Sequence, residues 1–264
     1  MLTFCNLFSG SGGNATYIGT EQDAVLVDCG MSCKAVREAM RFAGLEESLL
    51  RGVLVTHEHS DHIRGLEVFC RTLHLPVIAA EGTQQALDKC LSTLPREQRL
   101  TFRSGESFFC GSLECQSIPT SHDAADPVAY RIFAGSLSAA CATDLGVFSR
   151  EVSDALEGTQ AVLLESNHDP DMLRSNPHYP ANLVRRILGK RGHLSNESAA
   201  AAAVALVRTG TRHLQLGHLS KENNTPALAY QTSLQALTEA GLETSVTLHV
   251  ARPDGPAQVF RVSR

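Results

Sequence analysis

The residues best suited to chemistry lie in one short run, His57-Glu58-His59-Ser60-Asp61-His62. Imidazole and carboxylate groups are ligands that zinc and neighbouring first-row metals prefer. The run follows the apolar segment Gly52–Thr56, which predicts a buried strand. Side chains alternate along an extended segment, so His57 and His59 point to the same side. The run therefore predicts a metal site at the end of a strand.

A site for two metal ions needs further ligands from elsewhere in the chain. Three candidates, His122, Asp144 and His218, stand in expected loops after apolar segments. Each of them alone could equally be a surface or capping residue. Their order after the histidine run favours the interpretation that all three complete one metal centre.

A glycine-rich segment near the start, Ser9-Gly10-Ser11-Gly12-Gly13-Asn14, could bind an anion. Its glycines allow backbone N–H groups to approach a phosphate closely, and Ser9, Ser11 and Asn14 add polar side chains. It is not a P-loop, because the Lys-Ser/Thr ending is missing. A phosphate pocket and a simple tight turn between two strands are equally compatible with this pattern.

Positive charge is concentrated in one segment, although the net charge of the chain is −5. Between Met172 and Asn196 there are five cations and no acid, which indicates either a solvated helix face or a nucleic-acid contact. The segment leads to His193, so we expect Arg185 and Arg186 to attract a nucleic-acid backbone towards that residue. With only 5% aromatic residues, sequence-specific reading of bases is not expected.

Strands and helices are expected in both halves of the chain. The expected strands are Leu2–Phe8, Ala15–Gly19, Ala24–Asp28, Gly52–Thr56, Pro76–Ala79, several between Thr101 and Cys141, Ala161–Glu165, His213–Gly217 and Ser245–Val250. The expected helices are Ser32–Gly44 (with Ser32 as N-cap and Gly44 just past the end), His62–Leu73, Thr83–Leu91, Ala181–Leu188, Glu197–Arg208 and Pro226–Ala240. This order predicts one α/β domain over residues 1–264, an αββα sandwich of two mixed β-sheets with helices on the outer faces.

The composition limits which classes of protein this chain can belong to. A hydrophobic content of 43% is ordinary for a folded domain, and no apolar run is long enough to cross a bilayer. The N-terminus lacks the pattern of a secretory signal, so a cytoplasmic location and no membrane partner are expected. The eight cysteines form no C-x-x-C pair, which favours reduced, buried thiols over a disulfide framework. No pattern indicates an oligomeric state.

The motifs resemble those of the metallo-β-lactamase fold superfamily, where H-x-H-x-D-H is followed by a lone His, a bridging Asp and a last His. The resemblance implies two divalent metal ions, zinc or manganese, with iron possible. It implies that Asp28 orders the cluster through hydrogen bonds. The implied ligands are His57, His59 and His122 for one ion and Asp61, His62 and His218 for the other, with Asp144 bridging.

Three segments are similar to YycJ/WalJ-type proteins, a group linked with 5′-to-3′ DNA exonuclease activity: Ser9–Asn14, Gly192–Asn196 and Gly217–Pro226. The resemblance implies a phosphodiesterase in which a metal-bridging hydroxide, held by Asp61 and Asp144, attacks phosphorus. By analogy with the related ribonuclease Z branch, Glu165 would orient His193, which protonates the leaving oxygen or donates to a phosphate. No segment is long enough for the arm that grips transfer RNA, which disfavours transfer-RNA processing.

Two other functions remain open from the sequence. The same two-metal chemistry serves a small-molecule hydrolase acting on a thioester, lactone or lactam. A metal-binding regulatory protein without hydrolytic activity is the third hypothesis. His193, the basic segment and the glycine-rich loop favour phosphate, and the resemblance favours DNA over RNA.

Overall fold

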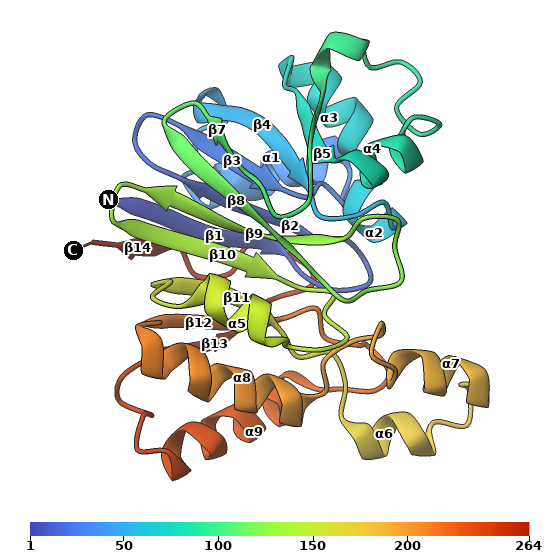
Figure 1. Ribbon diagram of the computed structural model, residues 1–264, viewed down its shortest axis with the longest axis vertical. Coiled ribbons are helices and arrows are strands. Elements are labelled where there is room, and N and C mark those ends of the chain that lie inside the picture. Colours follow the sequence, from blue (N-terminus) through green and yellow to red (C-terminus); the bar gives the residue numbers. More distant parts are fainter. Residues whose placement is uncertain (264) are drawn as a thin grey trace.

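A computed structural model describes residues 1–263, in which two seven-stranded sheets pack face to face with helices on both outer faces (Figure 1). The αββα sandwich predicted from the sequence is confirmed. In the first sheet the neighbours from β3 to β6 are parallel and the others antiparallel. Its strand order is β14 (Phe260–Val262), β1 (Leu2–Phe8), β2 (Ala15–Gly19), β3 (Ala24–Val27), β4 (Leu50–Val55), β5 (Val77–Ala80) and β6 (Arg99–Phe102).

The second sheet repeats this mixture of directions. Neighbours from β13 to β10 are parallel, and those from β10 to β7 are antiparallel. Its order is β13 (Thr247–Val250), β12 (His213–Gly217), β11 (Ala161–Glu165), β10 (Leu137–Ala142), β9 (Val128–Ala134), β8 (Leu113–Pro119) and β7 (Ser107–Cys110). The carboxyl ends of the parallel strands in both sheets lie at one edge of the sandwich.

Helices cover both sheets, and two lie beyond the edge (Figure 1). The first sheet is covered by α1 (Cys33–Phe42), α3 (Leu66–Leu73) and α4 (Glu81–Leu87), and α2 (Ser60–Ile63) lies at the edge. The second sheet is covered by α5 (Arg150–Leu156), α8 (Asn196–Thr209) and α9 (Pro226–Glu239). The helices beyond the edge are α6 (Pro170–Ser175) and α7 (Ala181–Ile187). Two 3₁₀ turns occupy Glu47–Leu49 and Arg96–Gln98.

Strand alternation explains the layers of the core. In β11, Leu163 packs in the cluster between the sheets, whereas Val162 and Leu164 pack on the helix side. Ala199 and Ala203 of α8 belong to that outer cluster. Their small side chains let the helix approach the sheet closely.

One predicted helix is divided in two. The sequence pattern predicts a continuous helix over His62–Leu73, but α2 ends at Ile63 and α3 begins at Leu66. Gly65 separates them, and a Cβ there would lie 1.8 Å from the carbonyl oxygen of Met31. Only glycine permits this contact, which seats α2 against the loop after β3.

No helix within residues 1–263 is long and apolar enough to cross a membrane. The eight cysteines form no disulfide within that range, and six of them are buried.

Candidate metal centre

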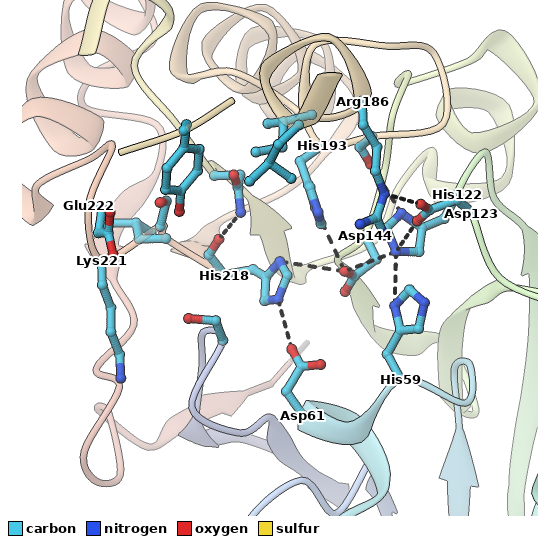
Figure 2. A pocket seen from close by; sticks show the side chains of 18 residues that line it. His59, Asp61, His122, Asp123, Asp144, Arg186, His193, His218, Lys221 and Glu222 are labelled. Carbon is cyan, nitrogen blue, oxygen red and sulfur yellow. Dashed lines mark hydrogen bonds and ion pairs between the residues drawn. The ribbon is translucent and has the colours of Figure 1, made fainter. Parts of the chain in front are cut away.

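The predicted ligands converge at the edge where the parallel strands end. The histidine run follows β4, His122 follows β8, Asp144 follows β10 and His218 follows β12. Figure 2 shows His59, Asp61, His122, Asp144 and His218 around one cavity, with Asp144 between His122 and His218. The structure therefore brings all seven predicted ligands together.

The first ligand group consists of His57, His59 and His122. Nδ1 of His59 lies 3.0 Å from Nε2 of His57 and 3.4 Å from Nε2 of His122. On their outer sides, Nδ1 of His57 lies 3.0 Å from the hydroxyl of Thr56, and Nδ1 of His122 lies 3.1 Å from the carbonyl of Gly192. Burial lowers the pKa of His57 and of His122, which favours the neutral imidazole that binds metals.

The second ligand group consists of Asp61, His62 and His218. Oδ2 of Asp61 lies 3.5 Å from Nε2 of His62 and 3.4 Å from Nε2 of His218. Buried carboxylates stand behind both rings, at 2.8 Å from Asp28 to Nδ1 of His62 and at 2.8 Å from Glu165 to Nδ1 of His218. These contacts fix each ring with Nε2 towards the other ligands.

Asp144 joins the two groups. One carboxylate oxygen lies 3.6 Å from Nε2 of His122, and the other lies 3.3 Å from Nε2 of His62. This second oxygen, Oδ2, is buried and makes no hydrogen bond within residues 1–263. Burial would raise the pKa of Asp144, but His218 and His62 hold it well below its usual value. Its position and charge suit a shared metal ligand.

The spacing of these atoms tests whether the site fits a metal. In tetrahedral coordination with bonds of about 2.0–2.1 Å, neighbouring ligand atoms are about 3.3 Å apart. The separations above, from 3.0 to 3.6 Å, lie around that value and are mostly longer than ordinary hydrogen bonds. The carboxylate of Asp144, which faces both groups and has one buried oxygen without a hydrogen bond within residues 1–263, completes the match. The residues therefore fit a divalent metal centre.

Backbone strain is concentrated at this site. Asp28, Asp144 and His218 have φ values of 61°, 58° and 56°, and His74 is the only other non-glycine residue within 1–263 with positive φ. Such conformations cost roughly 1–3 kcal/mol each and persist where the surrounding structure enforces them. Each of the three follows a strand and turns its side chain into the ligand cluster.

Glu165 connects the metal centre to His193. One oxygen of this fully buried carboxylate lies 2.8 Å from Nδ1 of His193 and 2.8 Å from Nδ1 of His218. The other oxygen accepts from the backbone N–H groups of Leu145 and Leu194. Burial opposes ionisation, yet the neighbouring His193 lowers the pKa of Glu165 to about 2. His193 lines the cavity beside Asp144, as Figure 2 shows.

The glycine-rich loop contacts the metal ligands. The hydroxyl of Ser9 accepts from the backbone N–H of His218, and the amide of Asn14 lies 3.3 Å from Asp61. Ser9 and Asn14 are buried, whereas Ser11 lines the cavity. The phosphate-binding role of these three residues stays a prediction, and the contacts of Ser9 and Asn14 support the ligands directly.

The two predicted phosphate-binding arginines lie in different places. Arg186 pairs with Asp123 and lines the cavity. Arg185 donates to the carbonyl of Ala181 on α7 and does not belong to the cavity lining. Sequence reasoning treated these neighbours as equivalent. Consecutive side chains on a helix point in different directions, and only Arg186 reaches the cavity.

Two supporting groups were missed from the sequence. The hydroxyl of Thr56 lies 2.9 Å from Asp28 and contacts both His57 and His62. Its place directly before the histidine run is a signal that could have identified it. The carbonyl of Gly192 orients His122, and no local sequence signal indicates a backbone contact across 70 positions.

Comparison with known proteins agrees with this geometry. Residues 23–219 match the model of the β-lactamase superfamily domain. The chain is 39% identical over 260 residues to the exodeoxyribonuclease YycJ of Bacillus anthracis, covering 98% of both chains. It is 37% identical over 246 residues to the exodeoxyribonuclease WalJ of Streptococcus pneumoniae D39, covering 92% of this chain and 91% of the relative.

The same fold occurs in the metallo-β-lactamase fold protein YhfI of Bacillus subtilis. That structure superimposes with a TM-score of 0.71 at 15% identity, over 98% of this chain and all of the other. The chain therefore belongs to the β-lactamase superfamily, the class that its fold and metal centre define. Within that superfamily, it is similar over nearly its whole length to the YycJ/WalJ proteins.

Proposed function

We propose that this protein is a metal-dependent nuclease that removes nucleotides from the 5′ end of DNA. The observation that carries the proposal is the pair of ligand groups joined by Asp144 at the cavity floor, with His193 beside them. Relatives that match 98% and 92% of the chain are named exodeoxyribonucleases. The His- and Asp-rich donor set suits two zinc or manganese ions, or iron.

The ligand groups, Glu165 and His193 would have separate roles in this activity. The first ligand group, the second ligand group and Asp144 would hold the ions, which when bound activate water and offset charge on the phosphodiester. Glu165 holds the ring of His193 so that Nε2 is free to face the substrate. Glu165 also raises the pKa of His193 against the effect of burial, which favours a protonated ring able to donate to the leaving oxygen. The carboxylates of Asp61 and Asp144 give negative charge to the cavity beside the metal ligands.

The test is incubation of metal-reconstituted protein with end-labelled single- and double-stranded DNA and RNA, with and without a 5′-phosphate, in zinc and in manganese. His59→Ala is the matched control. Stepwise release of mononucleotides from the 5′ end, absent in the variant, is the expected result. Metal-dependent hydrolysis of thioesters or lactones without cleavage of any polymer would overturn the proposal in favour of a small-molecule hydrolase.

A further inference from the structure

The glycine-rich loop, Ser9–Asn14, packs against the segment that follows β12. The hydroxyl of Ser9 accepts a hydrogen bond from the backbone N–H of His218. Further along this segment, Lys221 extends beside the loop, with its Nζ 3.4 Å from the position that a Cβ on Gly12 would occupy. Closure of the sandwich therefore brings an ammonium group to the tip of the loop.

A second cation contacts the same loop tip. Nη1 of Arg64 donates to the carbonyl of Gly12 at 3.1 Å. Lys221 and Arg64 are both exposed. Within residues 1–263 neither forms an ion pair with a carboxylate, whereas Arg186 across the cavity is paired with Asp123. The positive charge at the loop tip is therefore available to an anionic ligand.

The loop tip also offers backbone donors. The N–H of Gly13 donates to the carbonyl of Gly10, which closes a tight turn with Ser11 and Gly12 at its centre. The N–H groups of Ser11 and Gly12 donate to no acceptor in the part of the chain that the structure describes. Successive backbone N–H groups in a turn make an anion-binding concavity. Cations and backbone donors thus occur together.

The loop tip is next to the metal centre. The amide of Asn14, at the end of the loop, lies 3.3 Å from Oδ2 of Asp61. Ser11 and Lys221 line the same cavity as Asp61. Glu222 lines this cavity as well but forms no ion pair with Lys221 within residues 1–263. An anion at the loop tip would be the neighbour of a group bound at the metal ions.

The two cations indicate a direction out of the cavity. Figure 2 shows Lys221 at the side of the cavity opposite Arg186. Arg64 is not part of the cavity lining but contacts Gly12, so the positive charge continues outward across the loop tip. Phosphates follow one another closely along a DNA strand. A strand with one phosphate at the metal ions can therefore place the next at the loop tip.

We propose that Ser11, Gly12, Arg64 and Lys221, here called the loop rim, bind the phosphate that neighbours the one at the metal ions. This inference rests on the proposed nuclease function and adds a second phosphate site, with the DNA backbone passing over the glycine-rich loop. The ligand is a phosphate group of DNA, either the 5′-terminal phosphate or a backbone phosphate. Lys221 supplies charge at the cavity, and the backbone N–H groups supply hydrogen bonds.

The experiment measures binding of the metal-loaded protein to two DNA duplexes of one sequence, with either a 5′-phosphate or a 5′-hydroxyl. Phosphorothioate linkages near the 5′ ends protect both duplexes from cleavage. Lys221→Met is expected to raise Kd about fivefold, as for one exposed charge contact. It should also flatten the slope of log Kd against log salt by about 0.7–0.9, the value for one phosphate contact.

Two further variants are controls. Lys221→Arg retains the charge and should bind like the wild-type protein. Lys34→Met removes an exposed lysine of α1 that lies outside the cavity, and it should change neither Kd nor the slope.

The two duplexes identify which phosphate is bound. Weaker binding by Lys221→Met of the 5′-phosphorylated duplex alone assigns the loop rim to the terminal phosphate. An equal effect on both duplexes assigns it to the backbone. If Lys221→Met binds both duplexes as Lys34→Met does, the loop rim is overturned as a phosphate site.

Cleavage of unprotected duplexes and metal content separate this inference from the proposed function. If the wild-type protein cleaves DNA and Lys221→Met binds DNA normally, only the loop rim fails. If the wild-type protein neither binds nor cleaves DNA, the proposed function fails, and the assignment of the loop rim to DNA fails with it. Metal content should be the same in all variants, because the loop rim contains no proposed metal ligand. Loss of metal from Lys221→Met would overturn the inference by making Lys221 a support of the metal centre.

Discussion

Each ligand group takes two ligands from the run after β4 and one from another strand end, but the two groups are supported differently. Behind the second group stand two buried carboxylates, Asp28 and Glu165, each 2.8 Å from a ligand imidazole. Behind the first group, the described residues 1–263 place a hydroxyl and a backbone carbonyl, at 3.0 and 3.1 Å, and no carboxylate. A carboxylate behind an imidazole makes it a stronger and better oriented ligand. The comparison predicts that the second group holds its metal more tightly.

The largest effect is expected at Asp144, which belongs to both groups. Asp144→Asn removes the shared charge but retains the size and tolerates the positive φ of this position. We expect kcat to fall by roughly 10³-fold or more, because several kcal/mol of charge stabilisation is lost. Rates on DNA and metal content would be measured together. Asp154→Asn, in an exposed ion pair on α5, is the control, and loss of metal from one group only would show that Asp144 is not shared.

A second prediction tests whether His193 acts separately from metal binding. His193 lies next to Asp144, but its Nδ1 is 2.8 Å from the carboxylate of Glu165. Because His193 is outside both proposed ligand groups, His193→Ala should leave the metal content unchanged. The loss of a proton donor should lower kcat by about 10²–10³-fold. Rates and metal content would be measured together. Loss of metal from His193→Ala, as expected for His59→Ala, would show that His193 is a metal ligand.

The third prediction addresses the difference in support directly. Asp28→Asn weakens the contact behind His62 directly, and it reaches His57 only through the hydroxyl of Thr56. We therefore expect about 10–100-fold weaker binding of the metal in the second group and a smaller loss in the first. Stepwise chelation of the loaded protein would measure it. In the wild-type protein, the first group should release its metal first. Equal weakening of both metals in Asp28→Asn would contradict the prediction that Asp28 mainly supports the second group.

The sequence predicted one part of this centre better than the other. The run from His57 to His62 is local, so its spacing alone identifies it. His122, Asp144 and His218 depend on three strand ends meeting at one edge, and only their order after the run indicated them. Contacts such as Ser9 to the backbone of His218, 209 positions apart, depend on closure of the whole sandwich.

Element boundaries show the same limit. Most strands and helices could be predicted because hydrophobic periodicity reports which face is buried. The division of α2 from α3 could not, because it results from the contact between Gly65 and Met31 rather than from periodicity. Likewise, Arg185 and Arg186 have the same charge, and only the packing of α7 decides which one faces the cavity.

The smallest effect is expected at these two arginines, of which only Arg186 lies beside the first ligand group. Arg186 pairs with Asp123, whose carboxylate lies 3.4 Å from Nε2 of His122, so it lies where a phosphate would approach the metals. Arg186→Ala should flatten the slope of log kcat/KM against log salt by about 0.7, the value for one contact to a single strand. Arg185→Ala should flatten it less, because that side chain is outside the cavity. An unchanged slope after both substitutions would show that this basic segment does not attract nucleic acid. Its supported role would then be structural, through the hydrogen bond from Arg191 to the carbonyl of His122.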